Sequence, residues 1–145
     1  MPGATGRTTL RLVGTWVNSL TTNDGVNEIE YVKSQGYAFG LGVPELRLNA
    51  SAGWKGDVFG VDLRARYISA GEYNSTIAIR NNHIDAFTYV DLGVTADLTH
   101  YGADGVELYA KATNLFDKDP PEGAAFSPYY DVIGRYVTVG ARYRF

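Results

Sequence analysis

Residues 45–69 read ELRLNASAGWKGDVFGVDLRARYIS, and apolar and polar side chains alternate along most of this stretch. Its first half, residues 45–55, and its second half, residues 58–69, each keep their apolar side chains on alternate positions. The apolar positions are Leu46, Leu48, Ala50, Ala52 and Trp54, then Phe59, Val61, Leu63, Ala65 and Tyr67. A period of two is typical of a β-strand with two different faces, and Gly56 provides a tight turn between the halves. The stretch therefore predicts an antiparallel hairpin.

The same alternation recurs on both sides of this hairpin, in residues 88–99, 105–114 and 134–145. Residues 7–18 show it less cleanly, because Val13 and Val17 share a face with Arg11. The links alternate between tight glycine turns at 54–57 and 101–105 and long connections at 19–44, 70–86 and 115–133. Short turns at one end and long loops at the other predict one antiparallel up-and-down meander of about six long strands.

Composition limits the class of protein. The chain has 145 residues, enough for one domain, and 45% are hydrophobic. The mean hydropathy is only −0.17. No apolar run reaches the length of roughly 18 residues that a transmembrane helix needs. The absence of cysteine excludes disulfides, cysteine zinc sites and thiol nucleophiles, and the net charge of −3 gives no footprint for nucleic acid.

Three features indicate which solvent the apolar face meets. The expected strands have about 10 to 12 residues, near the length that crosses a bilayer at a tilt. The opposite face carries many charges, which a dry core would not accept. Aromatic side chains gather at the strand ends, as in the girdles of outer-membrane barrels. We expect Trp16, Tyr67, Tyr89 and Tyr136 at the long-loop end of the apolar face, and Trp54, Phe59, Tyr101, Tyr143 and Phe145 at the short-turn end.

Two segments resemble a known family. The run Asn114-Leu115-Phe116-Asp117-Lys118 resembles the end of the penultimate strand of TonB-dependent outer-membrane receptors. Residues 130–145 resemble the final strand of the same family, and residues 64–68 resemble a third strand. The C-terminal alternation is also similar to a general outer-membrane sorting pattern, formed here by Val137, Val139, Ala141, Tyr143 and Phe145. The resemblance covers most of residues 45–145.

This resemblance implies a segment of a 22-stranded transmembrane β-barrel in the outer membrane of a Gram-negative bacterium. Such receptors import a scarce ligand, such as siderophore-bound iron, cobalamin or an oligosaccharide. The expected partners are outer-membrane lipid, the remainder of the barrel and its plug, TonB through that plug, and the barrel-assembly machinery through the C-terminal strand. Residues 1–145 show neither a plug nor a signal peptide, so we expect a truncated C-terminal part that is inactive alone.

An alternative is a complete eight-stranded outer-membrane barrel with a structural or adhesive role. It would need residues 26–43 to cross the membrane, using alternation at Ile29, Tyr31, Tyr37, Phe39, Leu41 and Val43. Charges crowd the first part of this segment, and Pro44 would interrupt a strand ladder. We therefore favour an extension outside the membrane.

No catalytic, cofactor or metal site is expected, and we do not predict an enzyme. His83 and His100 are far apart in sequence, and Ser127 has no base nearby in the sequence. In a receptor, the ligand would meet the long loops and the upper wall of the lumen. The residues that we expect there are Asn81, Asn82, His83, Tyr129, Tyr130 and Arg135.

Overall fold

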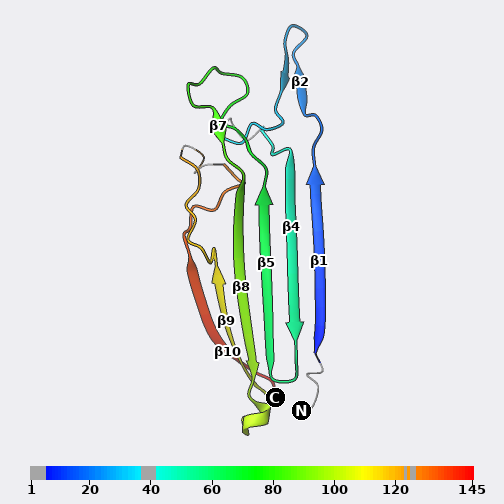
Figure 1. Ribbon diagram of the computed structural model, residues 1–145, viewed down its shortest axis with the longest axis vertical. Helices are drawn as coiled ribbons and strands as arrows, with labels where there is room; N and C mark the ends of the chain where they lie inside the picture. Colours follow the sequence, from blue (N-terminus) through cyan, green and yellow to red (C-terminus); the bar gives the residue numbers. More distant parts are fainter. Residues whose placement is uncertain (1–5, 37–41, 123, 125–126) are drawn as a thin grey trace.

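The computed structural model describes residues 6–36, 42–122, 124 and 127–145. Six long strands form one antiparallel sheet, in the order in which they occur along the chain (Figure 1). They are β1 (Arg7–Trp16), β4 (Leu46–Lys55), β5 (Phe59–Ile68), β8 (Phe87–Asp97), β9 (Val106–Thr113) and β10 (Tyr136–Tyr143). The predicted all-β meander of six long strands is confirmed, each strand starting and ending within about two residues of its predicted bounds.

The links between the strands also follow the prediction. The β4–β5 turn and the β8–β9 link lie at the same end of the sheet as the start of β1 and the C-terminus of the chain, and we call this the short-turn end (Figure 1). A short 3-10 helix, η1 (Thr99–Tyr101), precedes Gly102 and Gly105, whose positive φ angles of 82° and 75° suit glycine. The three long links meet at the opposite end, the long-loop end.

Two small hairpins occupy the long loops. One pairs β2 (Thr21–Asn23) with β3 (Glu28–Glu30), and the other pairs β6 (Gly71–Glu72) with β7 (His83–Ile84). Ile29 thus belongs to a short hairpin, and Val43 makes only an isolated parallel bridge with Val32. The described part of residues 26–43 contributes no strand to the large sheet, while the predicted alternation at Tyr37, Phe39 and Leu41 lies outside the described residues.

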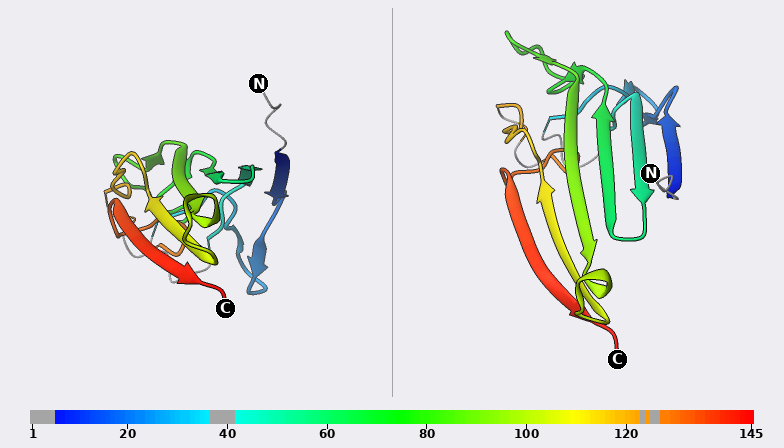
Figure 2. Two further views of the ribbon diagram at one scale, coloured as in Figure 1. Left: turned by 90° about the horizontal axis from the view of Figure 1, so that it is seen from below. Right: turned by 60° about the horizontal axis from the view of Figure 1, so that its bottom comes forward.

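The sheet curves along its width but does not close on itself (Figure 2). In the part of the chain that the structure describes, β1 and β10 are edge strands and do not pair with each other. The described strands therefore do not form a closed barrel. No helix among the described residues is long and apolar enough to cross a membrane.

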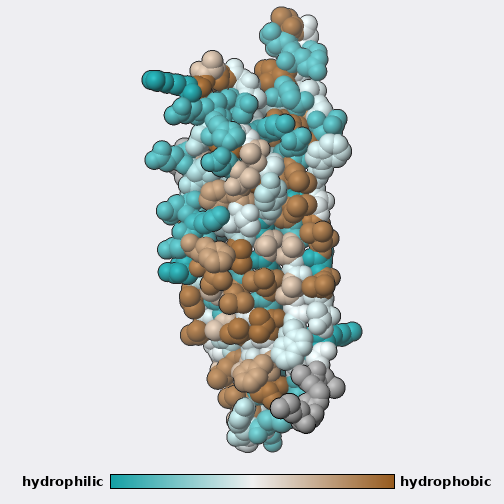
Figure 3. All heavy atoms as spheres, viewed as in Figure 1, coloured by the Kyte–Doolittle hydropathy of each residue, from teal (hydrophilic) through white to brown (hydrophobic). Residues whose placement is uncertain are grey.

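Strand register produces one continuous apolar face. A row of directly paired residues crosses all six strands with only aliphatic side chains: Leu10, Ala52, Leu63, Leu92, Ala112 and Val137. Figure 3 shows the resulting apolar band on the convex side of the sheet. Many of its large side chains stay exposed, with Leu63 at 43% and Val139 at 74% of full exposure. A soluble monomer rarely exposes so wide an apolar surface.

Two of the predicted girdle positions were wrong. Tyr89 pairs with Arg66 and Tyr136 pairs with Thr113, so both lie on the opposite, concave face of the sheet. The reason is parity, because successive side chains of a strand alternate between faces and these two tyrosines are one residue out of step. Trp16 and Tyr67 do lie on the apolar face.

The small buried core lies at the long-loop end of the concave face. Ile68 and Tyr89 belong to the sheet, whereas Ile84, Ala124 and Tyr130 come from the long loops. We call these packed loop segments the loop cap. The cap covers one end of the concave face and leaves the rest of that face accessible.

Candidate functional site

Every charged residue of the six long strands lies on the concave face. There are twelve such residues, and strand register places none of them among the apolar rows. They are Arg7, Arg11, Arg47, Lys55, Arg64, Arg66, Lys111 and Arg142, together with Asp62, Asp91, Asp97 and Glu107. Eight cations against four anions give this face a net charge of +4, while five cations and twelve anions elsewhere give −7. The overall charge of −3 thus conceals a positive concave face and an excess of acidic residues in the long loops.

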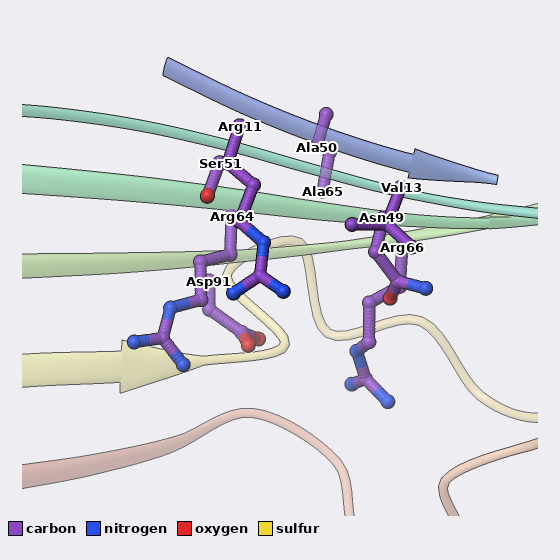
Figure 4. Close-up of a pocket in the computed structure, with 9 residues that line it drawn as sticks. All are labelled: Arg11, Val13, Asn49, Ala50, Ser51, Arg64, Ala65, Arg66 and Asp91. Carbon is purple, nitrogen blue, oxygen red and sulfur yellow. The ribbon is translucent and has the colours of Figure 1, made fainter. Parts of the chain in front are cut away.

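An open groove runs over the centre of this face, below the loop cap. It is lined by Arg11, Val13, Asn49, Ala50, Ser51, Arg64, Ala65, Arg66 and Asp91. Figure 4 shows the arginine side chains and the Asp91 carboxylate projecting from β1, β5 and β8 to one side of the sheet. Ala50 and Ala65 also line the groove, although their side chains belong to the apolar face on the other side of the sheet. The groove therefore presents three guanidinium groups as hydrogen-bond donors: those of Arg11, Arg64 and Arg66.

Two groove residues are tied to their surroundings. Arg66 lies with its guanidinium carbon 5.0 Å from the centre of the Tyr89 ring and one nitrogen 3.9 Å from Asp131 Oδ2. The Tyr89 hydroxyl in turn accepts a hydrogen bond from the Asp131 backbone nitrogen at 3.1 Å. Asp91 is 9% exposed, and its Oδ1 accepts the Asn114 backbone N–H at 3.0 Å. These contacts join the groove to the loop cap.

Tyrosine hydroxyls hold the loop cap together. Tyr130 donates to Gln35 Oε1 at 2.6 Å, and Gln35 Nε2 donates to the Ser69 carbonyl at 2.9 Å. Gln35 is fully buried, so its amide depends on these partners. Tyr129 donates to the Gly42 carbonyl at 2.9 Å. Burial raises the pKa of the Tyr129 and Tyr130 hydroxyls, so both remain neutral donors at ordinary pH.

The motif Asn114, Leu115, Phe116 and Asp117 is a turn that ends β9. Asn114 is 1% exposed with a φ of 51°, in the left-handed region that asparagine tolerates. Its side chain accepts from the Lys118 N–H at 3.0 Å and donates to the Lys118 carbonyl at 2.9 Å. Asp117, with a φ of 53°, accepts the Arg135 N–H at 2.6 Å. Asn114 therefore shapes the start of the last long loop, and Asp117 ties that start to Arg135, where the loop returns to β10.

The predicted ligand-facing residues fall into separate groups. Asn81, Asn82 and His83 belong to the β6–β7 hairpin, where Asn82 binds the Asn74 carbonyl and Glu72, and His83 contacts Asp85. The Tyr129 and Tyr130 hydroxyls donate hydrogen bonds within the loop cap, as described above. Arg135 is exposed beside β10. The structure does not bring these six residues together around one described groove, and their predicted role as ligand contacts stays a prediction.

The predicted C-terminal pattern lies along one face of the last edge strand. Val137, Val139, Ala141 and Tyr143 share the apolar face of β10, and the Tyr143 and Phe145 rings are 6.5 Å apart. All four strand residues are exposed. Their role in sorting stays a prediction.

None of the polar residues that line the groove was among the predicted ligand-facing residues; they are Arg11, Asn49, Ser51, Arg64, Arg66 and Asp91. Their common signal was available, because each occupies a polar position of an alternating strand. The sequence alone did not give the strand register, which places these residues side by side. Among the residues that the structure describes, no three His, Asp or Glu side chains gather closely enough to hold a metal ion. A scan against protein-family profiles and searches of curated proteins and of solved structures find no match.

Proposed function

We propose that this chain forms part of the wall of a large outer-membrane β-barrel of the TonB-dependent receptor type. The complete barrel would import a scarce ligand such as siderophore-bound iron, cobalamin or an oligosaccharide. One observation carries the proposal: all twelve charged residues of the long strands share one face, and the other face is apolar from β1 to β10. Lipid outside and water inside require this division.

Strand length supports a membrane setting. β1, β4 and β5 have 10 residues each. At about 3.4 Å per residue such a strand spans roughly 34 Å, and a tilt of about 40° reduces its height to roughly 26 Å. The apolar band of outer-membrane barrels is about 25 Å tall. These three strands therefore match the thickness that they would cross, whereas β9 and β10, with 8 residues each, are shorter.

The free edges call for further strands. The outer backbone groups of β1 and β10 have no ladder partner among the described residues, and lipid does not tolerate unpaired backbone polar groups. The two edge strands run in opposite directions, so an antiparallel wall can continue from both. The remainder of the barrel would supply these partners. TonB would act through the plug of the complete receptor, and barrel-assembly machinery would recognise β10.

The eight-stranded alternative is not favoured. It needs two more strands from residues 26–43, and the described part of that segment forms β3 and single bridges at the long-loop end. A wall of six strands is also narrower than the smallest ordinary barrel, which has about eight.

Uptake measurements in the source bacterium test this proposal. A Val139→Asp substitution puts a charge on the apolar face of β10, whereas the matched Thr138→Asp substitution puts it on the concave face. We expect Val139→Asp to remove the protein from the outer membrane and to abolish uptake of one of the ligand classes. A protonophore should stop the uptake of that same ligand class in cells with the unaltered protein. Thr138→Asp should keep both the location and the uptake. Equal behaviour of the two variants, or unchanged uptake of all three ligand classes without the protein, would contradict the proposal.

A further inference from the structure

Arg11 and Arg64 both line the groove of the concave face, and neither forms an ion pair or a side-chain hydrogen bond with any described residue. Elsewhere on this face, Arg66 lies near Asp131, and Arg142 binds Glu107 at 3.3 Å. A guanidinium offers five N–H donors in a planar fork that matches phosphate and carboxylate groups. Two such forks point into one groove (Figure 4).

Strand register aligns these groups. Arg11 pairs with Ser51, Ser51 pairs with Arg64, and Arg64 pairs with Asp91. Arg11 and Arg64 are thus two strands apart, a backbone separation of roughly 10 Å. Arg66 lies two residues along β5 from Arg64, on the same face and roughly 7 Å away. Flexible arginine side chains spanning these separations suit a ligand with more than one anionic group.

Neutral donors complete the groove. The Ser51 hydroxyl and the Asn49 amide lie between the arginine positions, and neither makes a side-chain hydrogen bond with a described residue. Asp91 is the one acid of the lining, and the backbone of Asn114 occupies one of its oxygens. The lining therefore has three cations to one anion, with hydroxyl and amide donors beside them. This donor excess favours an oxyanion over a cation or a neutral ligand.

We propose that this groove binds a small multivalent oxyanion, with two or more phosphate or carboxylate groups bridging Arg11 and Arg64. The assignment deepens the proposed function by giving the ligand a charge class, and it rests on that function for placing the groove inside the barrel wall. Arg66, held over Tyr89, marks the boundary of the site at the loop cap. Ser51 and Asn49 supply the remaining hydrogen bonds.

Calorimetric titration of the full chain in detergent micelles with inorganic pyrophosphate tests the site. We expect binding by the unaltered chain and a loss of affinity of roughly ten- to a hundredfold in Arg11→Gln and in Arg64→Gln, because each removes a charge-assisted contact. Arg64→Lys should lose less than Arg64→Gln, since it keeps the charge and loses only the fork. Arg142→Gln, at the short-turn end, serves as the matched control and should bind as the unaltered chain does.

Several results would overturn the assignment. They are no pyrophosphate binding at millimolar concentration, equal weakening in Arg142→Gln, or preferential binding of an acidic oligoglutamate peptide, which would indicate a protein partner. Far-ultraviolet circular dichroism of each variant checks that the strands persist. If the apolar face proves to be in water while pyrophosphate binding follows the expected pattern, the proposed function fails and the anion site stands.

Discussion

Replacing Asn114 by alanine should destabilise the fold more than its small size suggests. The change removes two side-chain hydrogen bonds to the Lys118 backbone, each worth about 0.5–1.5 kcal/mol. It also places a residue with a Cβ and no compensating polar group at a φ of 51°, which costs about 1–2 kcal/mol. Together we expect Asn114→Ala to lower the free energy of unfolding by about 3 kcal/mol.

Glycine separates the two contributions. Asn114→Gly also loses both hydrogen bonds but adopts the left-handed backbone without strain, so it should cost about 1 kcal/mol less than alanine. The control is Asn81→Ala, because Asn81 is exposed and should change stability by less than about 0.5 kcal/mol. The assay is equilibrium denaturant unfolding of the full chain in detergent micelles, followed by tryptophan fluorescence. A loss below about 1 kcal/mol for alanine, or a glycine variant no better than alanine, would refute this reasoning.

Three further predictions concern the apolar face, the loop cap and a loop carboxylate. In lipid vesicles, Leu63→Arg should lower the free energy of unfolding by about 2–4 kcal/mol. Thr95→Arg, on the concave face, should lower it much less. Equal losses in the two variants would contradict a lipid-facing Leu63. Tyr130→Phe leaves a buried glutamine oxygen unpaired and should cost about 1–3 kcal/mol by denaturant unfolding, against little change for exposed Tyr143→Phe. Backbone hydrogen bonds lower the Glu30 pKa from 4.5 to about 2. The stabilisation of the fold by the charged Glu30 carboxylate is therefore complete above pH 4.5 and is lost as the pH falls towards 2. A nuclear magnetic resonance titration of the carboxyl resonances should show the lowered pKa, and an unshifted pKa would contradict this prediction.

Much of the sheet could be predicted because the sequence pattern that marks a strand lies within the strand itself. Alternation between apolar and polar residues marks each strand and each face, and a glycine turn such as the one at Gly56 marks where the chain reverses. The same rule exposes the error at Tyr89, where parity within β8 already assigns the residue to the polar face. Side-chain type suggested a girdle, but strand periodicity decided the position.

The loop cap and the groove could not be predicted in the same way. Tyr130 and Gln35 are 95 residues apart, and Asn114 and Asp91 are 23 apart, so their contacts depend on how separate loops and strands align. Nothing local distinguishes Arg64 from any other arginine on a polar face. Only the register that places Ser51 between Arg11 and Arg64 turns scattered charges into a site.

Spin labelling along β5 tests the central claim most directly, because the chain has no cysteine and each introduced cysteine carries the only label. Residues 59–68 are labelled one at a time in the membrane-inserted chain, and collision rates with oxygen and with a water-soluble nickel complex are measured. We predict an alternation of period two, with oxygen favoured at Val61, Leu63 and Ala65 and the nickel complex at Asp62, Arg64 and Arg66. Equal nickel accessibility on both faces, or the reverse alternation, would contradict a wall with lipid on one side and water on the other.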